Sequence, residues 1–398
     1  MEKIINQNHS KETYYYILSN ILEKASYYGL RSIMVLYMIS EMLNMEREDA
    51  FNLYGYLTSS YIISQILGAV LGDFLIGNKK AIIAGALMQS IGLFSICSAS
   101  LYGLYIGMFL VIIGNGLFIP NMLSNFGKLY LKKTKLLDAG FTLFNFTSSI
   151  GIVLGTVVIA PIADTFGYKI VFIILGIITI LSIVPLLILE EQIPAPEKQQ
   201  KVEKSKKLKI ITTFVSAFLF LGLYQLGHIR INDLQYVFEN SSIFLIPASW
   251  WSSLLPALSV PISLFAIILW SYFYSCQFSK LMLGFIFGTL SFGILYLMPE
   301  VPTEQTIPLF LLSLLLLAIA DIHVKPVVYS ILTQYANPKY LATLMSLAYI
   351  PTLLLTALVS FNQEYLFANP TVSVLIGLIG MTIFSFSFMI FQKVNKSV

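Results

Sequence analysis

Residues 172–209 read FIILGIITILSIVPLLILEEQIPAPEKQQKVEKSKKLK, and this stretch decides the fold. Its first half is apolar on every side of a helix, which indicates a segment buried in lipid rather than an amphipathic surface helix. Its second half, residues 190–209, is polar and highly charged, so it is typical of a flexible connector. We therefore predict a membrane-spanning helix followed by a linker that divides the chain.

The composition of the whole chain also indicates a membrane protein. Of its 398 residues, 57% are apolar and 11% are charged, whereas about a quarter of the residues of a soluble protein are charged. The net charge of +4 cannot supply the basic surface of a nucleic-acid-binding domain. Two cysteines cannot form the framework of a disulfide-rich secreted domain. These exclusions leave a polytopic membrane protein, whose partner is the lipid bilayer and not nucleic acid.

Twelve segments are long and apolar enough to cross a bilayer as helices, and too long to be barrel strands. The predicted fold is an all-α membrane protein with twelve transmembrane helices in two six-helix bundles, residues 1–189 and 210–398, joined by a cytoplasmic linker at 190–209. The predicted spans are residues 14–39, 51–75, 81–98, 102–127, 139–163, 169–189, 209–231, 243–273, 280–298, 307–333, 340–361 and 371–392.

Lysine and arginine are distributed very unevenly between the two sides of the predicted bundle. If both termini are cytoplasmic, Arg47 and Lys169 are on the outer side and 18 lysines are on the cytoplasmic side. Those 18 are Lys3, Lys11, Lys79, Lys80, Lys128, Lys132, Lys133, Lys135, Lys198, Lys201, Lys204, Lys206, Lys207, Lys209, Lys280, Lys339, Lys393 and Lys396. Because cytoplasmic loops carry the excess of positive charge, we expect an integral protein of the bacterial inner membrane with both termini in the cytoplasm.

Two predicted spans contain ionisable side chains, each of which costs about 2.5–3.5 kcal/mol near the bilayer centre. They are Glu23, Lys24 and Arg31 in the first span, and Asp321, His323 and Lys325 in the tenth. At lipid-facing positions such residues would be costly, so they are expected to face partners or water. Two polar stripes, one from each half of the chain, fit a central cavity between two bundles.

Helical spacing shows which of these residues share a face. In the first span Asn20, Glu23, Tyr27 and Arg31 form one stripe, and Lys24 begins a second row beside it that continues with Tyr28. We expect the first stripe to face the cavity.

In the tenth span Asp321, Lys325 and Tyr329 are successive i+4 neighbours, and His323 points elsewhere. A cation one turn away stabilises the carboxylate anion of Asp321, which makes it a poor proton carrier, so Glu23 is the candidate for protonation. An alternative remains open: Glu23–Lys24 and Asp321–Lys325 could be structural ion pairs that only fix helix packing.

Three further polar residues lie near the ends of spans. Asp73 lies in GAVLGDFLIGNKK at the cytoplasmic end of the second span, where its carboxylate can pair with a neighbouring helix end or a basic loop. We interpret Asp73 as a gate residue rather than a substrate ligand. His228 and Arg230 lie near the outer end of the seventh span, where we expect them to reach water by snorkelling.

Several motifs resemble those of the proton-dependent oligopeptide transporters, a family with the major facilitator fold. LEKASYYGLRSIMVLYM, from Leu22, is similar to their first-helix signature, and GAVLGDFLIGNKK to the loop after their second helix. GNGLFIPNMLSNFGKLY resembles the fourth helix, FTLFNFTSSIG the fifth, IPASWWSSLLP the eighth and ADIHVKPVVYS the tenth. The resemblance extends from about residue 18 to 350 and touches both halves.

The resemblance implies roles for individual residues. Glu23 matches a glutamate associated with proton coupling, and Lys24 stands where that motif has arginine. Tyr27, Tyr28, Arg31 and Asp321 match positions that bind substrate in the family, and we add Ser149 and Lys325 as candidate substrate-binding residues of this chain. Among these, Asp321 matches a glutamate that contacts the amino terminus of the peptide.

This chain departs from the family pattern at several positions. Asn20 replaces the first glutamate of the first-helix motif, and Ser149 replaces an asparagine in the fifth helix. Ile119 and Leu255 stand where the family has lysine and asparagine, and Lys325 is an added cation. The seventh helix has Tyr224 before Gln225 where the family has glutamate before glutamine.

The function predicted from these features is secondary active transport. We expect proton-coupled uptake of small peptides or related zwitterions by alternating access, by a monomer that is not an enzyme and needs no cofactor or metal beyond the proton gradient. An alternative remains open: a major facilitator carrier or exporter of another, more apolar metabolite, because Ile119 and Leu255 are apolar where the family is polar.

Overall fold

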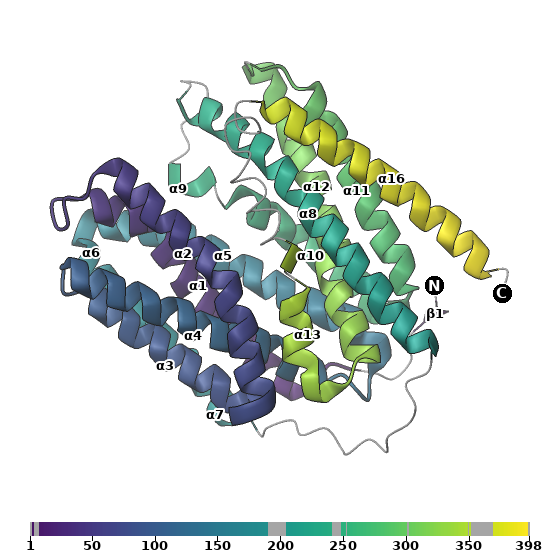
Figure 1. The fold of residues 1–398 in the computed structure, drawn as a ribbon, viewed down its shortest axis with the longest axis horizontal. Helices are drawn as coiled ribbons and strands as arrows, with labels where there is room; N and C mark the ends of the chain where they lie inside the picture. The colour runs from purple at the N-terminus through teal and green to yellow at the C-terminus, as the bar shows by residue number, and fades with distance from the viewer. Residues whose placement is uncertain are drawn as a thin grey trace.

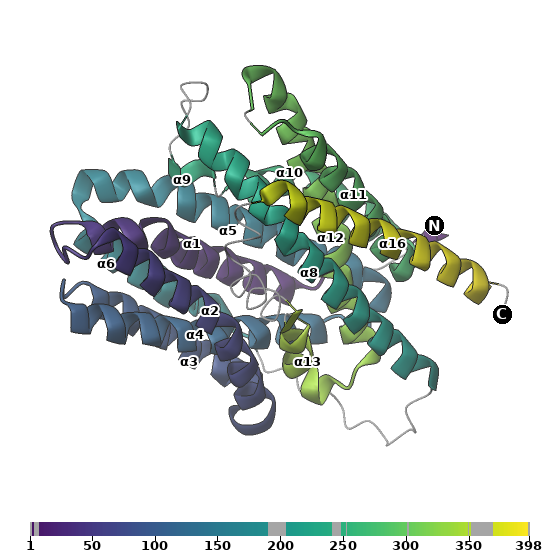
Figure 2. The same ribbon diagram turned by 45° about the horizontal axis from the view of Figure 1, so that its top comes forward.

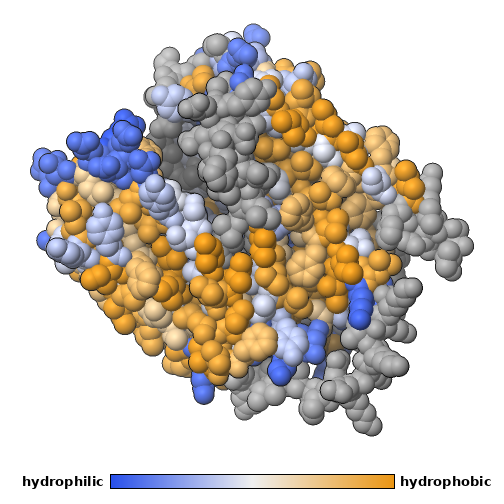
Figure 3. Space-filling view, in the orientation of Figure 1, coloured by the Kyte–Doolittle hydropathy of each residue, from blue (hydrophilic) through white to orange (hydrophobic). Residues whose placement is uncertain are grey.

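The computed structural model of the chain describes residues 2–3, 8–189, 204–240, 248–251, 253–300, 302–348, 350–351 and 369–396. These residues form long helices and one pair of two-residue strands (Figure 1). Ten helices in the described part are long and apolar enough to cross a membrane. Their apolar side chains cover the middle of the face in Figure 3, and hydrophilic residues gather toward its ends.

The N-terminal half begins with a short strand and then contains seven α-helices. Its elements are β1 (Glu2–Lys3), α1 (Lys11–Ile39), α2 (Arg47–Leu71), the π-helical turn η1 (Gly72–Ile76), α3 (Asn78–Ile96), α4 (Leu101–Lys128), the 3-10 turn η2 (Thr134–Leu136), α5 (Leu137–Phe166), α6 (Tyr168–Leu181) and α7 (Val184–Leu187). In this half α3 packs along α4, and α1 packs along α5.

The C-terminal half contains the remaining elements. They are α8 (Lys204–Asn240), α9 (Ala248–Trp251), α10 (Leu254–Tyr272), β2 (Phe273–Tyr274), α11 (Gln277–Leu297), the 3-10 turn η3 (Glu304–Thr306), α12 (Ile307–Tyr335), the 3-10 turn η4 (Pro338–Tyr340), α13 (Leu341–Leu347) and α16 (Pro370–Lys396). Here α11 packs against α12 and α16, and the two halves meet where α5 contacts α10 and α12 (Figures 1 and 2).

The ten apolar helices correspond to ten of the twelve predicted spans. The predicted first span is α1, which is long enough but carries too many polar residues to be among the ten. The predicted eleventh span, 340–361, begins with α13, and its residues 349 and 352–361 lie outside the described residues. In the predicted linker, residues 204–209 are the start of α8, and residues 190–203 also lie outside the described residues.

Both ends of the chain lie on one side of the molecule, which we call the terminal face (Figure 1). It contains β1, η1, η2, β2 and η4. The two strands pair in antiparallel fashion, Glu2 opposite Tyr274, so the first residues of the chain contact the C-terminal half. We call the described residues before α1, 2–3 and 8–10, the N-terminal strap. His9 adds to it, because its ring nitrogens lie 2.8 Å from the Tyr130 hydroxyl and 3.4 Å from the Ser271 hydroxyl.

Candidate substrate-binding cavity

A large cavity lies between the two halves and has two compartments. The outer compartment extends from the middle of the bundle away from the terminal face, between α1, α5, α8, α10 and α12. The inner compartment extends from the middle toward Phe141 and Tyr329. The compartments share the lining residues Tyr28, Arg31, Asn145, Ser148, Ile152 and Lys325. The cavity therefore has its charged residues at mid-depth.

On the N-terminal wall, the cavity-facing row of α1 is Lys24, Tyr28 and Arg31. These residues follow i, i+4, i+7 spacing, so they share one helical face. Glu23 and Tyr27, which were expected to face this cavity, line neither compartment; Tyr27 instead lines a side pocket beside Arg31. Arg31 is the one charged residue that belongs to the expected stripe and also reaches the cavity.

Glu23 is fully buried inside the N-terminal bundle. Asn115 of α4 donates a hydrogen bond from Nδ2 to its Oε1 at 2.8 Å, and Lys24 Nζ lies 3.3 Å from its Oε2. Asn20 points into the same bundle, where its amide donates to Thr147 and Ser148 of α5. The polar stripe therefore joins α1 to its neighbouring helices, and Lys24 connects the Glu23 carboxylate to the cavity wall.

Arg31 is held by tyrosines. Its Nε donates to the Tyr54 hydroxyl at 2.9 Å, and its guanidinium carbon lies 5.5–6.0 Å from the ring centroids of Tyr27, Tyr28 and Tyr54. No carboxylate in the described part of the chain forms an ion pair with it. A cation in an aromatic cage with no internal anion is well suited to bind an anionic ligand group.

On the C-terminal wall, α12 presents an ion pair. Lys325 Nζ lies 2.7 Å from Asp321 Oδ1, and the ammonium also lies 4.9 Å from the centroid of the Tyr224 ring. Both residues of the pair line the outer compartment, opposite Arg31. His323 points away from the cavity, as its spacing predicts: its ring contacts Trp270 and Phe287.

Other predicted positions also line the cavity. Ser149 of α5 and Leu255 of α10 line the outer compartment, and Ile119 of α4 lines the inner one. Tyr224 and His228 of α8, which the sequence reasoning did not assign to substrate binding, line the outer compartment with ring centroids 4.4 Å apart. His228 could have been found from the sequence, since it lies one turn after Tyr224.

Arg230 differs from its expected role. Instead of reaching water it is 2% exposed. Its guanidinium pairs with Asp233 at 2.5 Å and donates to the carbonyl oxygens of Met298 and Pro299 at 3.2 and 3.0 Å. These carbonyls follow the end of α11, so Arg230 ties α8 to the C-terminus of α11, where unpaired carbonyl groups need donors.

Asp73 lies at the terminal face, outside the lining of both compartments, and contacts the other half. Its Oδ2 accepts hydrogen bonds from the backbone N–H and the hydroxyl of Thr343 at 2.7 and 2.9 Å. Thr343 lies in the first turn of α13, where an acidic group is stabilised by the helix dipole. Asn78 donates to the other Asp73 oxygen at 3.0 Å and so fixes the carboxylate.

A second connection between the halves was missed by the sequence reasoning. Asp138 at the start of α5 forms a buried ion pair with Lys280 of α11, and it also accepts hydrogen bonds from Gln277 and Ser330. We call this group the inter-half lock. Both members of the ion pair are almost fully buried, at 2% and 3% exposure. Asp138 and Lys280 each lie at one end of an apolar span. They are 142 positions apart in the sequence, so helical spacing could not predict that they pair.

Two groups of membrane helices that face each other across a charged cavity form the architecture of helical membrane transporters. The sequence profile of the Major Facilitator Superfamily matches residues 17–394, which is nearly the whole chain. The chain belongs to the major facilitator superfamily.

Curated relatives include the dipeptide and tripeptide permease B of Photorhabdus asymbiotica, 27% identical over 218 residues that cover 53% of this chain and 44% of the permease. The dipeptide and tripeptide permease A of Pectobacterium carotovorum is 26% identical over 215 residues, 53% of this chain and 42% of the permease. The match thus spans less than half the length of these permeases. The uncharacterized transporter YclF of Bacillus subtilis is 23% identical, with 86% of this chain and 85% of YclF covered.

Solved structures of peptide transporters have the same fold. A mutant of the peptide transporter POT in complex with alafosfalin superposes with a TM-score of 0.66 at 20% identity and covers 96% of both chains. A POT family transporter in complex with a thioalcohol-conjugated peptide gives a TM-score of 0.66 at 19% identity, covering 98% of this chain and 99% of the other.

Proposed function

We propose that this protein is a proton-coupled carrier that takes up small peptides or related zwitterions by alternating access. The superfamily, the permeases among its relatives and the fold of its structural neighbours support this proposal. The observation that carries it is the charge arrangement of the cavity. Arg31 stands on one wall with no carboxylate partner among the described residues, and the Asp321–Lys325 pair stands on the other.

A zwitterion fits this arrangement in one orientation. Its carboxylate binds Arg31, and its amino group binds Asp321, whose partner Lys325 is then released to the carboxylate side. Binding thus exchanges an internal ion pair for contacts that cross the cavity. The cost of separating Asp321 from Lys325 is offset only by a ligand that carries both charges, which selects zwitterions over simple amines or acids.

Alternating access requires the contacts at the terminal face to break and re-form. In the present state the inter-half lock, the Asp73–Thr343 contacts and the N-terminal strap join the halves there. The outer compartment lies on the opposite side of the charged layer. Opening the terminal face separates Asp138 from Lys280 and Asp73 from α13, and Asp73 acts as a gate without contacting substrate.

Proton coupling is assigned to Glu23 through Lys24. The Glu23 carboxylate is buried beside α4, and Lys24 is the one charged neighbour that also reaches the cavity. Protonation of Glu23 removes the anion that holds Lys24, so the Lys24 ammonium becomes available to the substrate side. Proton uptake by Glu23 therefore favours substrate binding, and substrate binding favours proton uptake by Glu23.

The proposal includes the arrangement in the membrane. Together with the ten apolar helices, α1 and the region 340–361 make up twelve membrane spans. The protein acts as a monomer in the bacterial inner membrane, and its terminal face lies in the cytoplasm. The lysine distribution supports this orientation. In intact cells, Ser205→Cys should resist a membrane-impermeant thiol reagent. Rapid labelling from outside would reverse the topology.

The test of function is uptake of radiolabelled dialanine into proteoliposomes under an inward proton gradient. Uptake should exceed that of empty liposomes and collapse with a protonophore. Arg31→Gln should lower apparent affinity at least about tenfold, because a hydrogen-bonded ion pair is lost. Arg47→Gln, at the start of α2 against Phe51, is the matched control and should behave as wild type.

A second candidate is a carrier or exporter of a more apolar metabolite. It is favoured by Ile119 and Leu255, which place apolar side chains in the cavity. Uptake of dialanine that is indistinguishable from empty liposomes, with an intact fold, would reject the peptide proposal in favour of this one.

A further inference from the structure

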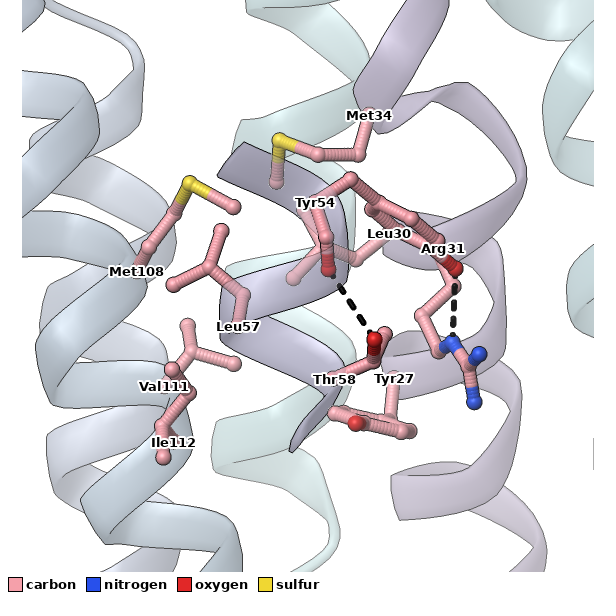
Figure 4. Close-up of a pocket in the computed structure, with 10 residues that line it drawn as sticks. All are labelled: Tyr27, Leu30, Arg31, Met34, Tyr54, Leu57, Thr58, Met108, Val111 and Ile112. Carbon is pink, nitrogen blue, oxygen red and sulfur yellow. Dashed lines mark hydrogen bonds between the residues drawn. The ribbon is translucent and has the colours of Figure 1, made fainter. Parts of the chain in front are cut away.

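A small side pocket opens beside Arg31, between α1, α2 and α4 (Figure 4). It is separate from the two cavity compartments but shares residues with them. Arg31 lines all three spaces, Thr58 lines the pocket and the inner compartment, and Tyr54 lines the pocket and the outer compartment. The pocket therefore adjoins the central cavity at Arg31, which has no carboxylate partner among the described residues.

The deep end of the pocket is lined by apolar side chains. Met34 and Met108 face each other across it, and Leu57, Val111 and Leu30 complete the wall (Figure 4). Met34, Met108 and Val111 are 2%, 5% and 4% exposed, so the wall belongs to the interior of the N-terminal half. Methionine side chains are flexible and polarizable, so such a wall adapts to unbranched and branched aliphatic groups alike.

The mouth of the pocket is polar and fixed in position. Tyr54 accepts the hydrogen bond from Arg31 Nε, and Thr58 donates to the backbone carbonyl of Tyr54 at 3.0 Å. In Figure 4 the terminal nitrogens of Arg31 lie on the side away from the methionines. No described residue accepts a hydrogen bond from these nitrogens, so they are available to a ligand carboxylate.

These features place a carboxylate-binding group and an apolar pocket side by side. A carboxylate bound to Arg31 belongs to the C-terminal residue of a peptide, and the side chain of that same residue is attached one carbon away. We propose that the pocket between α1, α2 and α4 receives the apolar side chain of the C-terminal residue, and so makes the carrier selective for peptides that end in methionine or leucine. This inference rests on the proposed function.

The test compares dipeptides of identical composition and reversed order. Competition against uptake of labelled dialanine is measured in proteoliposomes for Ala-Met, Met-Ala and Ala-Asp. Ala-Met should inhibit uptake at a concentration at least about tenfold lower than that of Met-Ala. This is expected because hydrophobic pockets discriminate by about 10- to 200-fold per methylene group. Ala-Asp should be the weakest, since it would place a carboxylate among the methionines.

Two variants assign the preference to this pocket. Met108→Trp fills it and should bring Ala-Met to within about threefold of Met-Ala. Phe109→Trp, at the neighbouring position of α4 where the side chain is 61% exposed, is the matched control and should keep the wild-type ratio. Met34→Ala enlarges the pocket and should shift the preference toward Ala-Phe. This variant tests the pocket assignment independently if Met108→Trp does not fold.

Equal inhibition by Ala-Met and Met-Ala in the wild-type protein would overturn the pocket assignment while leaving peptide transport intact. An order preference that survives unchanged in both Met108→Trp and Met34→Ala would overturn it too. Absence of inhibition by every dipeptide would instead reject the proposed function itself, and the pocket assignment with it.

Discussion

The two halves of the molecule differ in how closely their helix backbones approach each other. In the N-terminal half, glycines bring helix backbones together: a Cβ on Gly107 of α4 would lie 2.5 Å from the carbonyl oxygen of Gly92 of α3. In the C-terminal half, aromatic rings fill the space between helices, as where Phe220 and Phe285 pack with ring centroids 5.6 Å apart. Backbone-to-backbone contact leaves little freedom to adjust, whereas side chains can repack. The comparison suggests that the N-terminal half moves as a stiff unit.

The halves also hold their charges differently. The N-terminal half encloses Glu23 among amide and ammonium groups inside the bundle. The C-terminal half displays Asp321 and Lys325 on the cavity wall. An enclosed acid is suited to carry a proton, and an exposed pair is suited to exchange partners with a ligand. The predictions that follow test these contrasts, starting with the largest expected change in free energy.

The largest effect is expected where the two halves join. Asp138→Ala leaves Lys280 buried without its anion, which should destabilise the closed terminal face by about 3–5 kcal/mol. Labelling of a cysteine at Phe141, a buried residue at the inner end of the cavity, should become much faster in purified protein. Asp233→Ala breaks an ion pair within the C-terminal half and is the control. Slow labelling in Asp138→Ala would show that the lock does not hold this face closed.

The packing contrast predicts opposite responses to the same substitution. Gly92→Ala forces a Cβ against Gly107 and should destabilise the protein by about 1–3 kcal/mol. Gly222→Ala in α8 meets no atom within 4 Å and should be neutral or stabilise by up to about 1 kcal/mol, because alanine favours helix. Melting temperatures of the purified variants give the comparison. Equal losses at both positions would remove the distinction between the halves.

The charge contrast predicts that neutralising the Glu23 and Asp321 carboxylates impairs transport in different ways. Glu23→Gln keeps an acceptor for Asn115, so it should preserve counterflow exchange but abolish accumulation driven by the proton gradient. Asp321→Asn should weaken both, with an affinity loss of about 1.5–3 kcal/mol, because it removes a charged contact to the ligand. Parallel exchange and accumulation assays separate the two outcomes. Gradient-driven accumulation by Glu23→Gln with wild-type pH dependence would make Glu23 a structural residue.

The smallest effect concerns the N-terminal strap. Burial and the charge of Lys133 hold the pKa of His9 below its ordinary value of 6.5. Protonation therefore opposes the buried position of His9, so the strap is most stable above pH 6.5 and weakens as the pH falls below it. The expected loss is under about 1 kcal/mol. The melting temperatures at pH 8 and pH 5.5 should differ more for the wild-type protein than for His9→Gln. An equal difference in the two proteins would show that protonation of His9 does not weaken the strap.

Much of the fold could be predicted from the sequence, because lipid imposes a length and an apolar composition on each span. Ten predicted spans overlap apolar helices, although residues 243–247 and 252 of the predicted eighth span, 243–273, lie outside the described residues. The predicted first span overlaps α1, whose polar residues keep it outside these ten. Residues 204–209 of the predicted linker belong to α8, which could not be predicted from the sequence, since a lysine-rich segment is a good helix former as well as a good linker.

The candidate site could be predicted only in part. Spacing separated the two polar rows of α1 but could not decide which row faces the cavity. That choice is made by Asn115 on α4, whose amide attracts Glu23 into the bundle and turns Lys24 and Tyr28 to the cavity. The inter-half lock was missed for a similar reason. Helical periodicity describes neighbours within one helix, whereas Asp138 and Lys280 meet only after two bundles have docked.

The N-terminal strap has a consequence for how the protein is made. Glu2 and Lys3 are synthesised long before their strand partners Phe273 and Tyr274. At about 5–20 residues per second, a ribosome needs roughly 15–55 s to reach that second strand. During this interval the first half can insert and fold, but its start has nothing to pair with. Pairing of the strap is thus a late step of assembly, and it marks a chain whose second half has reached the membrane.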